Sequence, residues 1–392
     1  MKMSLNNKQY GAVSLFIVVI TALLVTVITV SFVGIMIKNQ QQASVIDLSQ
    51  SAYDSAQAGV EDAKRALLHL QSACVTDNPI CDAAKASVGP LQQCNDAVKT
   101  LDDVKAAAAK SKNGEVNVQV GGNNNDLDQA YTCVKISLQT DDYVGVLTKD
   151  DSKIIPLVGV GTFDTVNIEW FSAKDLQGSD MAVNVPSFDK GTPLLDQVSW
   201  TSDKSLNRPA ILRTQLIEFN NSGFSLSELN DNTVNATNNT LFLYPSTIVV
   251  SNGSAKSFSD YDLRLKTKSL TQVHCEASLT HNNYSCSEEI KLPKVITAGD
   301  HTAYLNLTAI YKNTHYRISL QSGVAPVQFN SVQPKIDSTG RTNDLFRRVE
   351  ARVELNDVNF PYPTAAIYTQ DDFCKDFLIT DNIDDYKTNC NN

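Results

Sequence analysis

An uninterrupted apolar run from Ala12 to Ile37 constrains this chain more than any other feature of its 392 residues. The run contains no Asp, Glu, Lys or Arg; Lys2 and Lys8 precede it and Lys38 follows it. Because a helix rises about 1.5 Å per residue, a helix of this length exceeds the roughly 30 Å hydrocarbon core of a bilayer. It is also far longer than the apolar part of a cleaved signal peptide. The run therefore predicts a membrane-spanning helix.

The helical pattern does not stop at Lys38. Apolar and small residues continue to recur every three or four positions, at Val45, Leu48, Ala52, Ala56, Val60, Ala63, Leu67 and Leu70. This spacing places them on one face of a helix. The first proline is Pro79, so nothing earlier forces a break. We expect one helix over residues 12–72, with residues 12–37 in a membrane.

Composition and charge narrow the class of protein. The net charge is −10, and Lys and Arg do not cluster, so we expect no nucleic-acid partner. Beyond residue 110 the chain is rich in Asn, Asp, Ser and Thr, with short β-branched runs between them. This pattern is typical of exported β-rich domains.

The cysteines also favour an oxidising compartment. They are even in number and contain no Cys-x-x-Cys pair, so we expect disulfides. Their positions form three groups: Cys74, Cys81, Cys94 and Cys133; Cys275 and Cys286; Cys374 and Cys390. The last two groups each enclose a loop and predict a pair, whereas the first four allow three pairings. The alternative is a metal site built from His274, Cys275, His281 and Cys286, although that spacing matches no zinc pattern.

Strand patterns fill most of the remaining chain. The first series predicts an antiparallel sheet that covers the helix face from Leu48 to Leu70; its members are 130–138, 143–147, 154–160 and 166–171. The second series predicts a larger sheet or a second β domain; its members are 210–219, 241–251, 263–265, 270–275, 302–311 and 315–321. The expected class is α+β, with a long N-terminal helix on an antiparallel sheet and a larger β-rich head. We expect an α/β head with a disulfide-pinned helical insertion at 73–170 and a β-rich region at 171–392.

Linear signatures of catalysis are missing from the sequence. It has no Gly-x-Ser-x-Gly or His-Glu-x-x-His motif, and its histidines are scattered. Paired aspartates at 141–142, 150–151, 371–372 and 384–385 are candidate calcium ligands, but none has EF-hand spacing, and solvated turns explain them better. We expect no enzyme activity, no cofactor and no metal.

The segment from Tyr10 to Leu68 resembles the N-termini of type IV pilins and pseudopilins, most closely the large minor pilins of the PilX type. In that family a basic leader ends in Gly, a prepilin peptidase cuts after it, and the new N-terminal residue is methylated. Gly11 and Ala12 occupy those positions, which makes residues 1–11 the leader. The stretch AYDSAQAGVE from Ala52 is similar to the family's alanine-rich helical segment. The charged stretch 346–354, preceded by a Gly-containing loop at 340–344, resembles a strand near the end of PilX-type chains.

One residue departs from the family pattern. Major pilins carry Glu at the fifth mature position, where this chain has Phe16. In the family that Glu neutralises the amino terminus of a neighbouring subunit within the apolar filament core, where an unpaired charge is costly. A subunit without it is a poor repeating unit. The departure therefore favours a minor subunit at or near the pilus tip.

The resemblance implies a single-pass membrane protein that moves to the cell surface as part of a pilus. Its implied partners are other pilin subunits through the N-terminal helix, the prepilin peptidase, the inner-membrane assembly machinery and a ligand on a host or partner cell. Implied roles are priming of assembly and adhesion. A type II secretion pseudopilin is the alternative within the family, and a signal-anchored surface enzyme is the alternative outside it.

Overall fold

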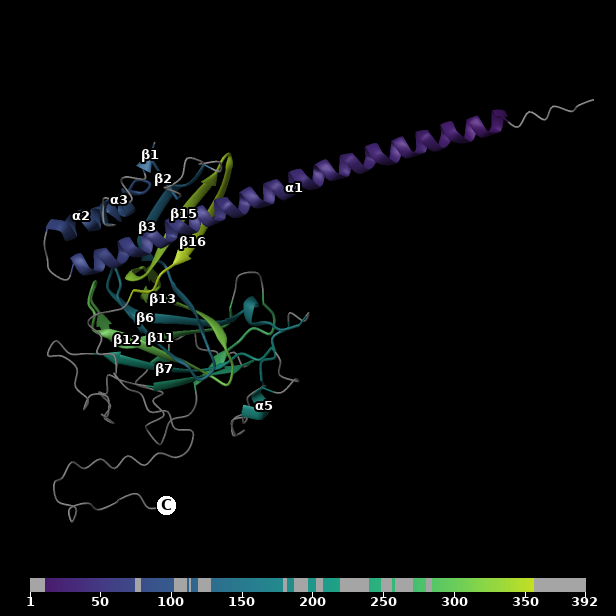
Figure 1. Cartoon of the computed structure of the whole chain (residues 1–392). Coiled ribbons are helices and arrows are strands. Elements are labelled where there is room, and N and C mark those ends of the chain that lie inside the picture. Colours follow the sequence, from purple (N-terminus) through teal and green to yellow (C-terminus); the bar gives the residue numbers. More distant parts are fainter. Residues whose placement is uncertain are drawn as a thin grey trace, which may run out of the picture. The chain divides into compact units, whose positions relative to one another are not determined.

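A computed structural model describes residues 11–74, 79–101, 111–112, 114–118, 128–178, 182–186, 197–201, 207–218, 240–247, 256–257, 271–279 and 284–355. It has an α+β layout with one long helix and three β-sheets (Figure 1). The tail at 356–392, with Cys374 and Cys390, lies outside the described residues, as do the leader up to residue 10 and the strand expected at 263–265.

Helix α1 spans Gly11–Ala73, 63 residues in one element (Figure 1). Large apolar side chains from Leu15 to Ile46 are exposed, whereas those of the stripe from Ala52 to Leu70 are buried. The predicted helix is thus present, and its two halves face different surroundings. On its exposed side, two i,i+3 ion pairs support the helix: Lys64 bonds Glu61, and Arg65 bonds Asp62.

Sheet A packs against the buried half of α1. Its strand order is β1 (Ser111–Lys112), β2 (Glu115–Asn117), β3 (Gln129–Thr140), β15 (Phe329–Thr342) and β16 (Leu345–Arg352), and every pairing is antiparallel. Their shared core includes Val60, Leu67, Val134, Ile136 and Ile336. A sheet on the helix is confirmed, but its predicted membership was wrong, because β15 and β16 join β3 from far along the chain.

Small residues let α1 approach sheet A closely. A Cβ on Gly340 would lie 2.2 Å from the backbone oxygen of Ala52 and 2.2 Å from the backbone nitrogen of Ala56. A Cβ on Gly59 would meet Ser338 Oγ at 2.5 Å. Ser338 Oγ donates to the Ala56 carbonyl at 2.7 Å, so the contact is polar as well as tight. Gly340 belongs to β15, so the expected Gly-containing loop at 340–344 is reduced to the two-residue turn at 343–344.

Two further sheets face each other across a second core. Sheet B has the order β14-β13-β6-β11-β9, with β4 on β13, and sheet C has the order β10-β8-β7-β12-β5. Their strands are β4 (Tyr143–Leu147), β5 (Ser152–Pro156), β6 (Phe163–Ser172), β7 (Ile211–Glu218), β8 (Thr240–Ser246), β9 (Lys256–Ser257), β10 (Thr271–His274), β11 (Tyr284–Ile296), β12 (Ala303–Ile310), β13 (Thr314–Ser322) and β14 (Ala325–Val327). The core joins side chains of both sheets, such as Ile168 and Ile318 from sheet B and Leu216 and Leu305 from sheet C.

This β domain, residues 141–328, is inserted between two neighbouring strands of sheet A. Thr140 ends β3 and pairs with Phe329, which begins β15. The expected division at residue 170 falls inside β6, so it separates strands that share one core. The described chain divides instead into two parts. One is sheet A with its helix, formed by residues from both ends of the described chain, and the other is the inserted β domain.

A helical segment between α1 and sheet A carries two disulfides. It includes α2 (Pro79–Ser87) and α3 (Asp96–Leu101), and the bonds join Cys74 to Cys81 and Cys94 to Cys133. The predicted helical insertion pinned by disulfides is thus present in the described residues, and residues 92–95 lie at the edge of β3. In the inserted β domain, Cys275 is bonded to Cys286, and a short 3-10 turn at Ala173–Asp175 and α5 (Gln197–Thr201) complete the elements.

Candidate functional site

The exposed apolar half of α1 is the most distinctive surface of the described chain. Leu15, Phe16, Leu23, Val30 and Phe32 are each more than 60 % exposed. No other described helix is long and apolar enough to cross a membrane. An exposed apolar surface of this size marks a contact with lipid or with another apolar surface.

The hydroxyls within this half of α1 do not interfere with burial in an apolar medium. Thr21 Oγ1 donates to the Ile17 carbonyl at 2.8 Å, and Thr29 Oγ1 donates to the Val25 carbonyl at 2.6 Å. Thr26 and Ser31 likewise donate to backbone oxygens one turn earlier. Because each hydroxyl hydrogen is already bonded, transfer from water leaves none of these donors unsatisfied.

The residues expected at a processing site lie at the start of α1. Gly11 is its first residue and Ala12 its second. Phe16 follows a turn later and its side chain is 68 % exposed. A peptidase that cleaves between Gly11 and Ala12 would leave a helix whose apolar half begins at its new N-terminus.

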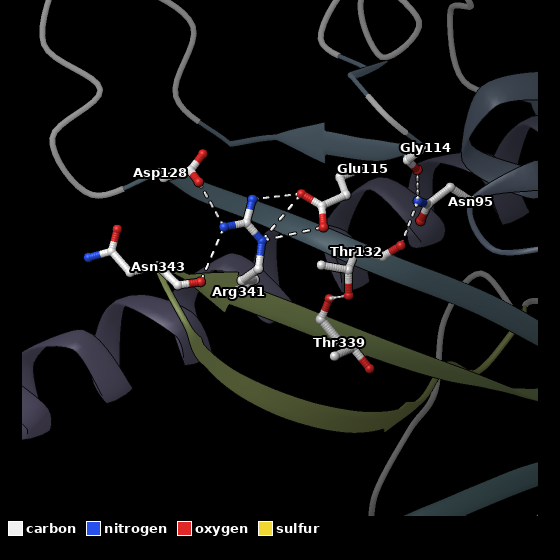
Figure 2. A network of polar contacts seen from close by, with 8 residues as sticks. All are labelled: Asn95, Gly114, Glu115, Asp128, Thr132, Thr339, Arg341 and Asn343. Carbon is white, nitrogen blue, oxygen red and sulfur yellow. Dashed lines mark hydrogen bonds and ion pairs between the residues drawn. The ribbon is translucent and has the colours of Figure 1, made fainter.

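A second candidate site, which is polar, lies at one edge of sheet A (Figure 2). No pattern in the sequence predicted it. Beyond the short pairing with β2, the edge of β3 is met by two amide side chains. Asn95 accepts from the Val134 backbone nitrogen at 2.8 Å and donates to the carbonyls of Gly114 and Thr132 at 2.8 and 3.1 Å. Gln92 accepts from the backbone nitrogen of Ile136 and donates to its carbonyl. The amides thus replace a neighbouring strand, which protects this edge from pairing with another chain.

Asn95 is suited to this position in two ways. It is fully buried and its φ is +67°, in the left-handed region that Asn tolerates better than most residues. Its backbone nitrogen also donates to the Val134 carbonyl at 2.9 Å. The adjacent Cys94–Cys133 bond fixes this segment to β3.

Arg341 ties together three parts of sheet A (Figure 2). From β15 it reaches across β3 to bond Glu115 on β2 at 2.7 Å, Asp128 directly before β3 at 2.8 Å, and the Asn343 carbonyl at 3.2 Å. The two carboxylates raise the pKa of the guanidinium above its ordinary value. These charge-assisted bonds fix the relative position of β2, β3 and β15.

Polar contacts also join sheet A to the inserted β domain. Gln333 accepts from the Val144 nitrogen at 3.0 Å and donates to its carbonyl at 2.8 Å. Arg352 pairs with Asp142 at 2.7 Å, and Lys153 pairs with Glu354. The junction is therefore specified by side chains of β15, of β16 and of Glu354, which follows β16.

Two alternative interpretations of the sequence can be placed on the structure. Cys275 and Cys286 are bonded to each other, so their sulfurs are not thiolate ligands for a metal. No group of three His, Cys, Asp or Glu side chains in the described ranges is arranged to hold a metal ion. Of the paired aspartates, Asp142 pairs with Arg352, Asp141 accepts from Gln328, and Asp151 accepts from Thr148.

A His–Asp pair is the arrangement in the inserted β domain most like a catalytic group. His315 Nδ1 lies 2.6 Å from Asp175 Oδ1, and the same carboxylate accepts from the backbone nitrogens of His315 and Ser172. Ser172 is the N-cap of the 3-10 turn, and Asp175 is the N3 residue of its capping box. The carboxylate is thus bonded as a structural cap. The two residues are 140 positions apart, so no linear motif signals them.

Comparison of the chain with protein-family models, with curated proteins and with solved structures found no match.

Proposed function

We propose that this chain is a minor type IV pilin, located at or near the pilus tip, that contributes to pilus assembly and to adhesion. Its N-terminal helix would first anchor it in the inner membrane and then pack among the helices of other pilin subunits. The prepilin peptidase and the assembly machinery of the inner membrane are the partners that this role requires.

The observation that carries the proposal is the division of α1 into two halves. In its first half the apolar side chains are exposed and the hydroxyls donate to backbone carbonyls of the same helix. Its second half packs its apolar stripe against sheet A. A simple membrane anchor needs only the first half. A helix that continues without interruption into the core of the exported domain couples that domain rigidly to whatever surrounds the apolar half.

Phe16 supports a place outside the repeating shaft. At this position an acidic side chain would pair with the amino terminus of the next subunit, and an apolar ring offers no such partner. The inserted β domain supports the adhesive part of the proposal, because it is a large addition that sheet A and α1 do not need for their own core.

Mass spectrometry of the mature chain tests the proposal. In cells that possess the prepilin peptidase, we expect a chain that begins at N-methylated Ala12, and Gly11→Leu should retain the leader because the bulky side chain blocks cleavage. Immunogold labelling of the inserted β domain should then mark one end of purified pili. A mature chain that still begins at Met1 would overturn the proposal.

A further inference from the structure

Strand β15 is interrupted close to the point where the inserted β domain joins sheet A. Its pairing with β3 stops at Asn330 and resumes at Lys335, so that only Leu138 of β3 lies opposite the residues between them. We call residues 331–334 the β15 bulge; its first residue, Ser331, has a φ of +58°, in the left-handed region. The hydrogen-bond ladder between β3 and β15 therefore has a break at this bulge.

Two side chains of the β15 bulge are anchored in the inserted β domain. Val332 is buried in the core between sheets B and C. Gln333 is also buried, and its amide bonds both the backbone nitrogen and the backbone oxygen of Val144 on β4. From Lys335 onward, β15 pairs with β3 again and belongs to sheet A. The bulge is thus the place where the angle between sheet A and the β domain could change with the fewest lost ladder bonds.

A short segment after the pairing of β15 with β16 crosses this break. We call residues 352–355 the strap. The Val353 nitrogen donates to the Pro334 carbonyl at 3.0 Å. The Leu355 nitrogen donates to the Val332 carbonyl at 3.3 Å. The strap therefore continues the line of β16 alongside the bulge, where the pairing of β15 with β3 is missing.

The charged side chains of the strap reach both sheets of the inserted β domain. Arg352 donates to the backbone oxygen of Asp142, directly before β4, at 2.7 Å, and pairs with its carboxylate at 2.7 Å. Glu354 pairs with Lys153 on β5 of sheet C. Its carboxylate also acts on Tyr143 of β4, because burial raises the pKa of this hydroxyl and Glu354 adds to the shift. The strap thus contacts the β domain at separate points on sheets B and C.

We propose that the β15 bulge is a hinge and that the strap holds it closed. The two chain connections to the β domain lie side by side, since Gln328 Nε2 donates to Asp141 Oδ1 at 2.8 Å. Two adjacent connections do not oppose rotation about a line through both, so contacts away from that line must set the angle. The strap supplies such contacts from β16, a strand that does not lead into the domain. It can therefore separate from the domain without breaking either connecting strand.

The strap is also the most easily displaced part of this junction. Its two ion pairs are partly exposed to solvent, and such pairs contribute little and are screened by salt. The bulge, by contrast, is held by the buried side chains of Val332 and Gln333. The sequence continues from Leu355 to residue 392, so a pull on that part of the chain acts on the strap before it reaches a connecting strand. Tension there would open the hinge while the β domain stays attached.

Pulsed dipolar spectroscopy on the full chain in detergent tests the hinge. Spin labels are attached through p-acetylphenylalanine in place of Leu68 on α1 and of Lys174 after β6, two exposed positions that leave the native cysteines untouched. We expect a narrow distribution of label-to-label distances in the otherwise unaltered chain. The double variant Arg352→Gln/Glu354→Gln should widen it about twofold or more, because both strap ion pairs are lost.

The double variant Arg348→Gln/Glu350→Gln is the matched control. It removes the same two kinds of charge from the same strand, but these charges pair with Asp337 and Lys335 inside sheet A. The width should therefore stay unchanged. A second measurement needs no strap substitution: about 1 M NaCl, which shortens the screening length to about 3 Å, should widen the distribution in the labelled chain.

Three results would overturn the proposal. Equal widths in the strap variant and the matched control would show that the strap does not set the angle of the β domain. A broad distribution in the chain with an intact strap at low salt would show that the hinge is not held closed. An unchanged width in high salt would show that the strap charges do not hold the junction. None of these measurements depends on processing of the N-terminus, so a failure of the pilin proposal would leave the hinge untouched.

Discussion

At the scale of single residues, the Asn95 side chain makes hydrogen bonds to the edge of β3 that a neighbouring strand would otherwise make. We predict that Asn95→Asp destabilises the protein by about 3 to 5 kcal/mol, because a buried carboxylate would face the carbonyls of Gly114 and Thr132 that the amide now bonds. Urea unfolding followed by circular dichroism measures the change. Exposed Gln93→Glu is the control and should stay within about 0.5 kcal/mol. Equal stability of the two variants would show that the edge of β3 does not need this amide.

Glu218 at the end of β7 makes stability depend on pH. Burial raises the pKa of its carboxyl to about 7, and Lys294 offsets only part of the shift. Because the folded pKa lies above the ordinary value of 4.5, the protonated form favours folding: this contribution is complete below about pH 4.5 and is lost as pH rises through about 7.

The unaltered chain should therefore lose about 3 kcal/mol of unfolding free energy between pH 4.5 and pH 8, and Glu218→Gln should not. Unfolding free energies of both proteins, measured across this pH range, make the comparison. Exposed Glu289→Gln on β11 should leave the profile as it is. Parallel profiles for the Glu218 variant and the unaltered chain would contradict the assignment.

At the scale of elements, α1 shows how neighbouring residues face different surroundings. Leu67 is fully buried against sheet A, and Leu68 is 62 % exposed. We predict that Leu67→Asp lowers the unfolding free energy by about 4 kcal/mol or more, through lost apolar burial and an uncompensated charge. Leu68→Asp should change it by less than about 0.5 kcal/mol. Thermal melts of both variants make the comparison, and similar melting temperatures would refute the packing.

The contact between α1 and β15 depends on the absence of a side chain at Gly340. Gly340→Ala should cost about 3 kcal/mol, because its Cβ would overlap backbone atoms of Ala52 and Ala56 that cannot move independently of the helix. Gly161→Ala is the control, since its Cβ would meet only Val327 at an ordinary 3.7 Å. Denaturant midpoints for the two variants should differ clearly, and a mild effect at Gly340 would mean that the helix can lift from the sheet.

The sequence predicted elements well where local pattern decides them. The apolar run and the stripe up to Leu70 predicted α1 almost to its ends, and alternation found strands such as β3, β4, β7 and β13. It missed β15, because Asn, Gln, Pro, Asp and Gly in this strand have low β propensity. Ser338 and Gly340 are there because the helix passes closely, which only the folded chain reveals.

Candidate site residues divide in the same way. Those at the start of α1 follow from a linear pattern, and so does the cysteine pair that encloses one loop. Asn95 and Arg341 were missed because their partners lie on other strands, up to 226 positions away for Arg341 and Glu115. Short-range pattern carries no information about which strands become neighbours.

At the scale of the whole described chain, sheet A and its helix are formed by residues from both ends of the described range, and the β domain is inserted between them. We predict that replacing residues 141–328 with Asn-Gly, which links the paired residues Thr140 and Phe329 through a tight turn, still allows the Cys74–Cys81 and Cys94–Cys133 bonds to form. Non-reducing peptide mapping checks this. Stability should fall, because Phe329 and Val332 lose their core. Scrambled cysteine pairs would show that sheet A cannot form without the insertion.

The pairing of Thr140 with Phe329 also determines how the protein carries mechanical load. A force applied to the inserted β domain is transmitted to sheet A through β3 and β15, which are adjacent and antiparallel. The force therefore pulls both strands in the same direction and does not separate one from the other. Tension then passes to the contacts of both strands with α1 and to the pairing of β15 with β16. If the domain were attached through one strand, tension would break that strand's ladder hydrogen bonds one at a time. Attachment through two paired strands distributes the tension across sheet A and transmits it to the long helix α1.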